Sequence, residues 1–374
     1  MFRPAVGALL RPRSAALAGP IDGERVERHT PSNARVEVDG KYFQLDGHRW
    51  VVRGLTYGPF APNESGEFLP APSRVASDFA HIRELGGNAI RVYHVPPRWL
   101  LDAALEHDLR VFIDVPWEKH RCFFEDWDSQ QEARRRIRDT ARALGNHPAT
   151  FAISVANEFP TNIARFYGKT KLERFISELF DVVKQESPEC PVTFANYPPT
   201  EFLEPRGRDF VCFNVYLENR QNMRAYLRRL QHVAGGLPLL LGECGSDSVR
   251  RGAAGQARII TGHAREVEGQ DLAGSFVFSY TDDWYTGGQQ VEDWGFGVTR
   301  ADRSEKPAAL ALRRAWARQM SPPKLSANSK LRWPKVSIVV CSYNGAATLE
   351  QCLDSLGNRG SPLQEFSAAG KGEG

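Results

Sequence analysis

Eight apolar runs alternate with amphipathic helical runs along most of this 374-residue sequence, and the alternation predicts an α/β fold. The apolar runs are rich in Val, Ile and Phe, as strands buried in a parallel sheet are. Eight strand–helix units in about 250 residues match the number and size of the units of a (β/α)8 TIM barrel. The expected strands are residues 50–58, 88–94, 110–117, 150–158, 192–198, 210–216, 238–244 and 275–284.

The residues before the first strand predict a tail and a short β-hairpin. Within residues 1–33, three arginines, Arg3, Arg11 and Arg13, and no acidic residue precede Asp22. The apolar patch of this segment is soon interrupted by Arg-Pro-Arg, so we expect a disordered tail in preference to a transit or secretory segment. Within 35–52, apolar and polar residues alternate around the Asp-Gly pairs at 39–40 and 46–47, which favours antiparallel hairpins.

Helical spacing of apolar residues fills most of the gaps between the expected strands. Several of these runs end in Gly or Pro, which are typical of helix ends. The gap between the fifth and sixth strands is short and contains no convincing helix. The barrel is therefore predicted over residues 34–318. The expected helices are residues 75–86, 99–108, 131–148, 172–187, 223–236 and 257–269.

The composition changes after the barrel. Residues 319–334 are rich in Pro, Ser and Lys and are expected to form a linker. Residues 335–356 follow as a fresh strand, turn and amphipathic helix, and residues 357–374 contain nothing that forms a core and are expected to be a disordered tail. One strand–helix unit cannot bury its own faces, so 335–356 is interpreted as a C-terminal strand–helix fragment, the truncated start of another domain.

Composition limits the classes of function. Hydrophobic residues at 41% and charged residues at 25% are typical of a soluble globular protein. The net charge of +3 predicts no nucleic-acid binding. No apolar stretch reaches the roughly 20 residues that span a bilayer. The six cysteines have no metal-binding spacing, so we expect no metal and no cofactor, and their positions in strand-like runs favour a reducing, cytoplasmic location.

Two glutamates end two of the apolar runs. Glu158 closes ATFAISVANE and Glu243 closes LPLLLGE. If both runs are parallel strands, both carboxylates emerge at the carboxyl-end face of one sheet, where barrels carry out chemistry. Paired carboxylates are the minimum equipment for cleaving or transferring a glycosidic bond. The alternative is that each glutamate is an ordinary loop carboxylate in a salt bridge. That alternative does not explain why both glutamates follow an unbroken apolar strand.

Other strand-end residues suit a neutral polyhydroxylated ligand. Amides, phenols and an arginine bind hydroxyl groups, and indole rings stack on sugar rings. Three alternatives stay open: Trp117 can face the core, His94 can be a polar rim residue, and Asp114 can be a structural hydrogen-bond partner. The candidate substrate-binding residues are Arg91, His94, Trp117, Asn157, Tyr197, Asn214, Tyr216 and Trp284.

The ordered set of motifs resembles a known group of enzymes. In glycoside hydrolases of clan A, an asparagine–glutamate pair ends the fourth strand and a second glutamate ends the seventh, as Asn157-Glu158 and Glu243 do here. FQLDGHRWVVRGLTYGP, NAIRVYH and FNVY resemble parts of the barrel of glycoside hydrolase family 2. The resemblance covers residues 36–318. Family 2 enzymes usually carry β-sandwich domains ahead of the barrel, whereas only a short hairpin precedes it here.

The resemblance implies a retaining mechanism. Glu243 would attack the anomeric carbon, while Glu158 would protonate the leaving oxygen and then deprotonate the acceptor. It also implies that Arg91 lies near the nucleophile, that Tyr216 faces it, and that Asn157 holds the sugar 2-hydroxyl. We expect a carboxyl separation of about 5 Å, whereas about 8 Å or more would indicate inversion.

The residues after the linker resemble a second family. KVSIVVCSYNGAATLEQCLDSL is similar to the start of an inverting glycosyltransferase of family 2, in which the residues matching Ser342, Tyr343 and Asn344 line the nucleotide pocket. The junction predicts a glycosidase barrel fused to a glycan synthase, with an oligo- or polysaccharide, specifically a β-glucan, as substrate and water or a sugar as acceptor. The alternative is a non-catalytic barrel that binds glycan and guides the glycosyltransferase.

Overall fold

The computed structural model describes residues 32–320 and four later residues, Val340, Leu349, Glu350 and Cys352. The chain divides into two units, Met1–Ser321 and Pro322–Gly374. Every element given below belongs to the first unit. The predicted tails, the linker and nearly all of the predicted fragment at 335–356 lie outside the described residues.

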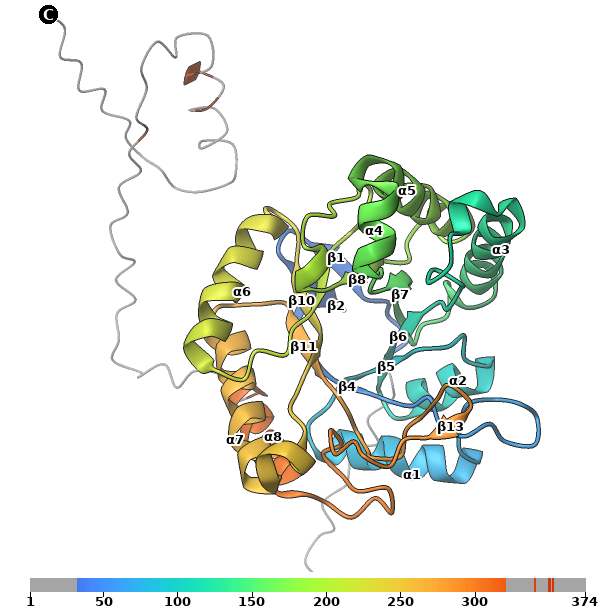
Figure 1. The fold of residues 1–374 in the computed structure, drawn as a ribbon. Helices are drawn as coiled ribbons and strands as arrows, with labels where there is room; N and C mark the ends of the chain where they lie inside the picture. The colour runs from blue at the N-terminus through green and yellow to red at the C-terminus, as the bar shows by residue number, and fades with distance from the viewer. Residues whose placement is uncertain (1–31, 321–339, 341–348, 351, 353–374) are drawn as a thin grey trace, which may run out of the picture. The chain divides into compact units, whose positions relative to one another are not determined.

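Eight strands within residues 32–320 form a closed parallel barrel, which confirms the predicted fold (Figure 1). They are β4 (Val52–Thr56), β5 (Ala89–Val92), β6 (Arg110–Asp114), β7 (Thr150–Asn157), β8 (Val192–Asn196), β9 (Val211–Asn214), β10 (Leu239–Cys244) and β11 (Gly274–Val277). Consecutive strands pair in parallel, and the pairing of β11 with β4 closes the ring. Most strands end before their predicted ends, because the polar residues there belong to the loops that follow.

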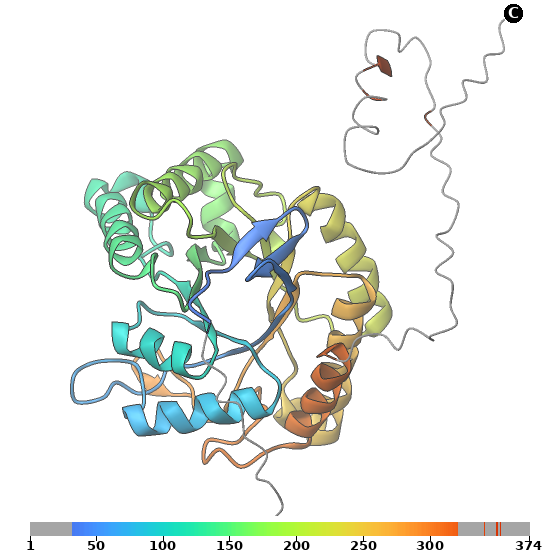
Figure 2. The same ribbon diagram turned by 180° about the vertical axis from the view of Figure 1, so that it is seen from behind.

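A three-stranded antiparallel sheet precedes the barrel and lies across one of its ends (Figure 2). Its strands are β1 (Glu37–Asp39), β2 (Tyr42–Leu45) and β3 (His48–Trp50). The turns between them contain Gly40, Asp46 and Gly47 at positive φ, a conformation that Asp-Gly turns favour. The predicted antiparallel start is confirmed. The predicted first barrel strand is divided at Val51, because Trp50 still belongs to this sheet.

Phe43 of β2 anchors this sheet to the barrel. The side chain is fully buried. Its ring lies edge-on to the rings of Phe151 and Phe210, with centroid distances of 4.9 and 5.2 Å. The small sheet therefore closes the amino-terminal end of the barrel by inserting an aromatic ring, and the opposite end is left for the rim loops.

Phe43→Ala is expected to lower the free energy of unfolding by about 3–5 kcal/mol, because a ring leaves a closely packed core and a cavity remains. Chemical denaturation monitored by circular dichroism measures the loss. Phe202→Ala is the matched control, since that ring is 39% exposed. Equal losses in the two variants would show that the sheet does not seal the barrel.

Helices surround the barrel and connect most of its strands (Figure 1). They are α1 (Pro72–Glu84), α2 (Arg98–Glu106), α3 (Trp127–Leu144), α4 (Thr161–Tyr167), α5 (Lys169–Glu186), α6 (Arg220–Ala234), α7 (Ser248–Gly269) and α8 (Pro307–Met320), with 3-10 turns at Phe123–Glu125 and Pro198–Thr200. The six predicted helices are present, and α4 and α8 were not predicted. Helix α7 begins before its predicted start. Gly252, at φ 68°, interrupts the helical spacing, so the residues ahead of it show no continuous helical pattern in the sequence. No helix in the described part of the chain is long and apolar enough to cross a membrane.

Candidate active site

A cluster of polar side chains lies at the carboxyl ends of the barrel strands. Arg91 belongs to β5, Asn157 and Asn214 are the last residues of β7 and β9, and Glu243 lies one residue before the end of β10. Glu158 follows β7 directly. Arg91, Asn214 and Glu243 are buried. The structure thus brings both predicted glutamates to the same rim, as the parallel strands require.

The two strands that carry the glutamates are irregular where these side chains emerge. The pairing of β10 with β9 shifts just before Glu243, and the pairing of β7 with β8 shifts just before Asn157. Gly242 occupies the first irregularity, where a Cβ atom would lie 2.8 Å from both Arg91 Nη1 and Asn214 Oδ1. Such bulges change the direction in which a side chain points. Glycine at 242 therefore allows the arginine and the amide to meet beside Glu243.

Three donors hold the carboxylate of Glu243. Tyr93 Oη donates to Oε1 at 2.8 Å, and Tyr216 Oη donates to Oε2 at 2.7 Å. Arg91 Nη1 donates to Oε1 at 3.3 Å. Burial and the charge of Glu243 raise the pKa of both phenols well above the ordinary value, so both remain donors. Each carboxylate oxygen of Glu243 is therefore fixed in position by at least one hydrogen bond.

Arg91 links the side chains around Glu243. Its Nε donates to Asp114 Oδ2 at 2.6 Å and its Nη2 donates to Asn157 Oδ1 at 2.9 Å. Its Nη1 also donates to Asn214 Oδ1 at 3.0 Å. Burial opposes the positive charge, but the carboxylates of Asp114 and Glu243 outweigh it, and the pKa of Arg91 is raised. The planar guanidinium therefore works as a rigid connector. Asp114 is a hydrogen-bond partner of Arg91, which agrees with the alternative that Asp114 has a structural role.

Glu158 has a different environment. Its backbone turns at φ 47°, a left-handed conformation that is uncommon outside glycine and concentrates at functional sites. Asn214 Nδ2 donates to Glu158 Oε1 at 2.7 Å and to Asn157 Oδ1 at 2.9 Å. Burial and then the charge of Glu243 raise the pKa of Glu158. The raised pKa keeps this carboxyl protonated closer to neutral pH, as a general acid requires.

The arrangement can support acid–base and nucleophilic chemistry. One carboxylate is fixed by two phenols and an arginine, and the other is held by an amide and has a raised pKa. Two carboxyl groups with such unlike surroundings can take different roles in one reaction. Among the described residues, no group of three or more His, Cys, Asp or Glu side chains could hold a metal ion.

An aromatic wall borders the pair next to β11. Trp284, in the connection between β11 and α8, is half-buried. Its ring centroid lies 5.5 Å from that of Tyr93 and 4.9 Å from that of Phe278. Tyr216 also contacts Phe278, at 6.2 Å. Trp284 therefore lies beside a phenol that holds Glu243, where an indole face is available to a sugar ring.

His94 and Tyr197, two other predicted rim residues, differ in their partners. Both ring nitrogens of His94 are buried without a hydrogen-bond partner among the described residues. Burial lowers the pKa of His94 to about 4, so the ring is neutral at pH 7. With Phe68 it lines a cavity of about 420 Å³. The Tyr197 hydroxyl shares a hydrogen bond of 3.0 Å with the Thr161 hydroxyl.

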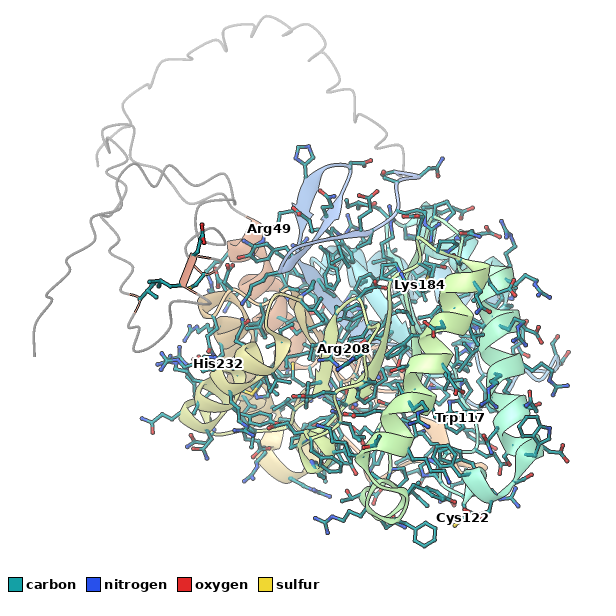
Figure 3. The ribbon with its side chains drawn as sticks, turned by 90° about the horizontal axis from the view of Figure 1, so that it is seen from above. Arg49, Trp117, Cys122, Lys184, Arg208 and His232 are labelled. Atoms are coloured by element: carbon teal, nitrogen blue, oxygen red, sulfur yellow. The ribbon has the colours of Figure 1, made fainter. Side chains whose placement is uncertain are left out.

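Trp117 is a core residue, which corrects the prediction that it faces a sugar. It is 6% exposed, and its ring packs 5.1 to 5.8 Å from those of Phe123, Phe159 and Phe175. Its indole N–H donates to the carbonyl of Val155 at 2.7 Å. Figure 3 shows its side chain among those close to α5. Packing and the satisfied N–H leave the indole no part in a binding surface.

Sequence reasoning missed Tyr93 and Lys119. Tyr93 lies two residues after Arg91, so strand alternation places both side chains on one face, and this signal was available in the sequence. Lys119 is half-buried in the loop after β6. Burial lowers the pKa of Lys119, while the charges of Asp114 and Glu158 oppose this, which places the ammonium group near both carboxylates. An irregular loop has no period from which this position could be predicted.

Comparison with solved structures finds proteins that share the barrel. A β-glucuronidase from Ruminococcus gnavus matches with a TM-score of 0.65 and 18% identity, over 76% of this chain and 53% of its own. A Bifidobacterium dentium β-glucuronidase complexed with coumarin-3-O-glucuronide matches with a TM-score of 0.65 and 19% identity, over 76% and 49%. A GH2 β-galacturonidase from Eisenbergiella tayi bound to galacturonate has a TM-score of 0.65 and 18% identity, over 76% and 54%.

These comparisons establish the fold. The chain spans about half the length of the solved structures it resembles. No protein-family model matches the sequence, and no curated protein matches it.

Proposed function

We propose that this barrel is a retaining glycoside hydrolase or transglycosylase that acts on a β-linked glycan through Glu158 and Glu243. The observation that carries the proposal is the unlike binding of the two carboxyl groups on one rim. Tyr93 and Tyr216 donate to Glu243, whereas Glu158 accepts one bond from Asn214 and has a raised pKa. The shared fold of glycosidases that act on β-linked sugars supports the same class.

In the first step, a Glu243 oxygen bonds to the anomeric carbon as the bond to the leaving oxygen breaks. The proton of Glu158 passes to that oxygen. In the second step, Glu158 takes a proton from water or a sugar hydroxyl, whose oxygen replaces Glu243 on the anomeric carbon. The fixed orientation of Glu243 favours this route because attack requires an aligned oxygen close to the carbon.

Asn157 is proposed to bind the sugar 2-hydroxyl. Its Oδ1 already accepts hydrogen bonds from Arg91 and Asn214, at 2.9 Å each. These bonds fix the amide so that its Nδ2 remains a donor for a sugar oxygen. A contact to the 2-hydroxyl strengthens in the transition state of retaining glycosidases and contributes several kcal/mol.

The sugar at the reacting position is proposed to be neutral, as in β-glucan. Two cations near the glutamates interact with protein carboxylates: Arg91 forms ion pairs with Asp114 and Glu243, and Lys119 is attracted by the charges of Asp114 and Glu158. A uronic acid carboxylate would compete with these groups. An aryl β-glucoside should therefore react faster than the matching β-glucuronide, and the reverse order would assign the protein to uronides, like its structural neighbours.

The acceptor is proposed to be a glycan as well as water. The resemblance of residues 335–356 to a family 2 glycosyltransferase supports a role in trimming or transferring a nascent chain beside a synthase. Incubation with a panel of β-linked oligosaccharides, analysed by mass spectrometry, tests the function. Products shorter than the substrate indicate hydrolysis, and longer products indicate transfer. Unchanged masses across the panel, with folded protein, would reject catalysis and favour a glycan-binding barrel.

Lys119→Met is expected to shift the alkaline limb of the pH profile of kcat/KM to higher pH. The charge of Lys119 lowers the pKa of Glu158, whereas burial and Glu243 raise it. Loss of that cation leaves the carboxyl protonated, and active as the acid, to a higher pH. A pH–rate series on an aryl β-glucoside measures the limb. A shift to lower pH would show that Glu158 is not the group that titrates there.

A further inference from the structure

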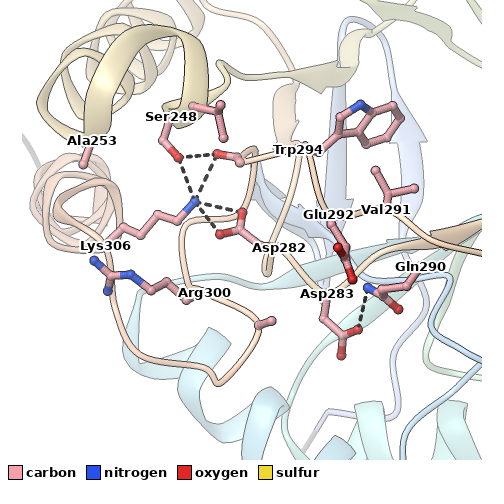
Figure 4. Close-up of a pocket in the computed structure, with 13 residues that line it drawn as sticks. Ser248, Ala253, Asp282, Asp283, Gln290, Val291, Glu292, Trp294, Arg300 and Lys306 are labelled. Atoms are coloured by element: carbon pink, nitrogen blue, oxygen red, sulfur yellow. Dashed lines mark hydrogen bonds and ion pairs between the residues drawn. The ribbon is translucent and has the colours of Figure 1, made fainter.

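A large cavity lies outside the glutamate cluster, between the β11–α8 connection and the start of α7 (Figure 4). Its volume is about 670 Å³. We call it the distal cavity, defined by six of its lining residues, Ser248, Asp282, Asp283, Gln290, Glu292 and Trp294. The β11–α8 connection also carries Trp284, so the same segment borders both the glutamates and the distal cavity.

Aromatic contacts join the distal cavity to Glu243. The Trp294 ring lies 6.2 Å from that of Trp284, which lies 5.5 Å from that of Tyr93. Tyr93 in turn donates to Glu243. Phe296 packs edge-on to Trp294 at 5.9 Å and fixes the ring, while the residue remains 36% exposed. A continuous row of aromatic rings therefore leads from Glu243 to the cavity.

Lys306 lies at the floor of the distal cavity and is paired with Asp282. Lys306 Nζ bonds to Asp282 at 2.7 Å, to Ser248 Oγ at 3.0 Å and to the carbonyl of Gly295 at 3.0 Å (Figure 4). Lys306 is almost fully buried. The charge of Lys306 is therefore balanced by Asp282, whereas Arg300, which also lines the cavity, is exposed and its Nη1 donates to Ser304 Oγ and to the carbonyl of Glu305.

The side of the cavity that faces solvent supplies hydrogen-bonding groups. Gln290 Nε2 donates to Asp283 Oδ1 at 3.3 Å, a long bond that a ligand hydroxyl can replace. Glu292 is exposed and makes no hydrogen bond or ion pair with another described residue. The cavity is lined by three carboxylates, Asp282, Asp283 and Glu292, and by two cations, Arg300 and Lys306, so the lining is net negative. A net negative lining with an amide and an indole suits a neutral sugar better than an anionic one.

We infer that the distal cavity is a subsite for the non-reacting units of a neutral oligosaccharide, with Trp294 as its stacking platform. The inference rests on the proposed function and extends it: the protein acts on chains of several sugars, and the units beyond the reacting one lie along Trp284 and Trp294. The substrate class is therefore a neutral β-linked oligo- or polysaccharide rather than a single terminal sugar on a small aglycone.

Trp294→Ala tests the subsite, with Trp127→Ala as the matched control, because Trp127 is 68% exposed on α3 and does not line the cavity. Wild-type kcat/KM should rise with chain length from cellobiose to cellotetraose, or from laminaribiose to laminaritetraose. Trp294→Ala should lower kcat/KM for the tetrasaccharide about tenfold more than for the disaccharide, the size expected for one lost aromatic contact. Trp127→Ala should leave the ratio between the two substrates as in the wild type.

Binding is measured separately from catalysis, so that failure of each claim can be recognised. Calorimetric titration of the Glu243→Gln variant with the tetrasaccharides should give binding that Trp294→Ala weakens about tenfold. Trp294-dependent binding without cleavage by the wild type would keep the subsite and reject the proposed catalysis. Cleavage with no dependence on chain length, an equal loss on short and long chains, or no tetrasaccharide binding would overturn the subsite.

Discussion

Glu243→Gln is expected to lower kcat on an aryl β-glucoside by about 10⁵-fold, comparable to removal of a catalytic nucleophile in other enzymes. The amide keeps the shape of the side chain but cannot form the glycosyl-enzyme bond. It also replaces one oxygen that accepts from Tyr93 or Tyr216 with a donor, so one phenol loses its partner. Steady-state kinetics on purified, folded variant measure the loss.

Two further variants distinguish chemistry from positioning. Tyr93→Phe removes one hydrogen bond to a charged group and should cost about 10- to 100-fold in kcat/KM. Glu118→Gln is the matched control, because Glu118 is exposed and, within the described part of the chain, its ion pair is with Arg121. It should leave kcat unchanged. If Glu243→Gln cost no more than Tyr93→Phe, Glu243 would be a structural residue and the barrel a binding protein.

Glu158→Ala is expected to give the second largest effect, and the effect should depend on the leaving group. For a β-linked disaccharide, which needs a proton on the leaving oxygen, kcat/KM should fall by about 10³- to 10⁴-fold. For a dinitrophenyl β-glucoside, whose leaving group departs without a proton, formation of the glycosyl-enzyme should be little changed. Kinetics on the two substrates give the comparison.

Azide provides the control for Glu158→Ala. This anion needs no general base, so it should react with the glycosyl-enzyme, restore turnover of the dinitrophenyl substrate and yield a glycosyl azide of retained configuration. Nuclear magnetic resonance identifies the anomer. Equal losses on both substrates, or an azide of inverted configuration, would remove Glu158 from the acid–base role.

The fold was predictable because each barrel strand carries its own local pattern. Runs such as 150–158 are apolar along their length, as strands buried on both faces are, and the helices between them repeat with helical spacing. The prediction failed where the local sequence pattern differs from the secondary structure that forms. Gly252 breaks the period inside α7, and Trp50 continues the apolar run into β4 although it pairs with Phe43 in the small sheet.

The site was predictable where its residues end strands. Parallel strands bring their carboxyl ends to one rim, so the positions of Glu158 and Glu243 followed from chain position alone. Contacts between loops carry no such rule. Trp117 packs against Phe159 and Phe175, which lie far from it in the sequence, and Lys119 approaches Glu158 through the path of an irregular loop. These placements depend on tertiary packing.

Trapping the intermediate tests the central claim most directly. An activated 2-deoxy-2-fluoro-β-glucoside forms the glycosyl-enzyme quickly and releases the sugar slowly. Mass spectrometry of the protein, followed by peptide mapping, locates the bound sugar. We predict one fluoroglucosyl group per protein molecule, attached to Glu243. Hydrolysis of the parent glucoside without a trapped sugar, or a sugar attached to any other residue, would contradict the retaining mechanism proposed for this barrel.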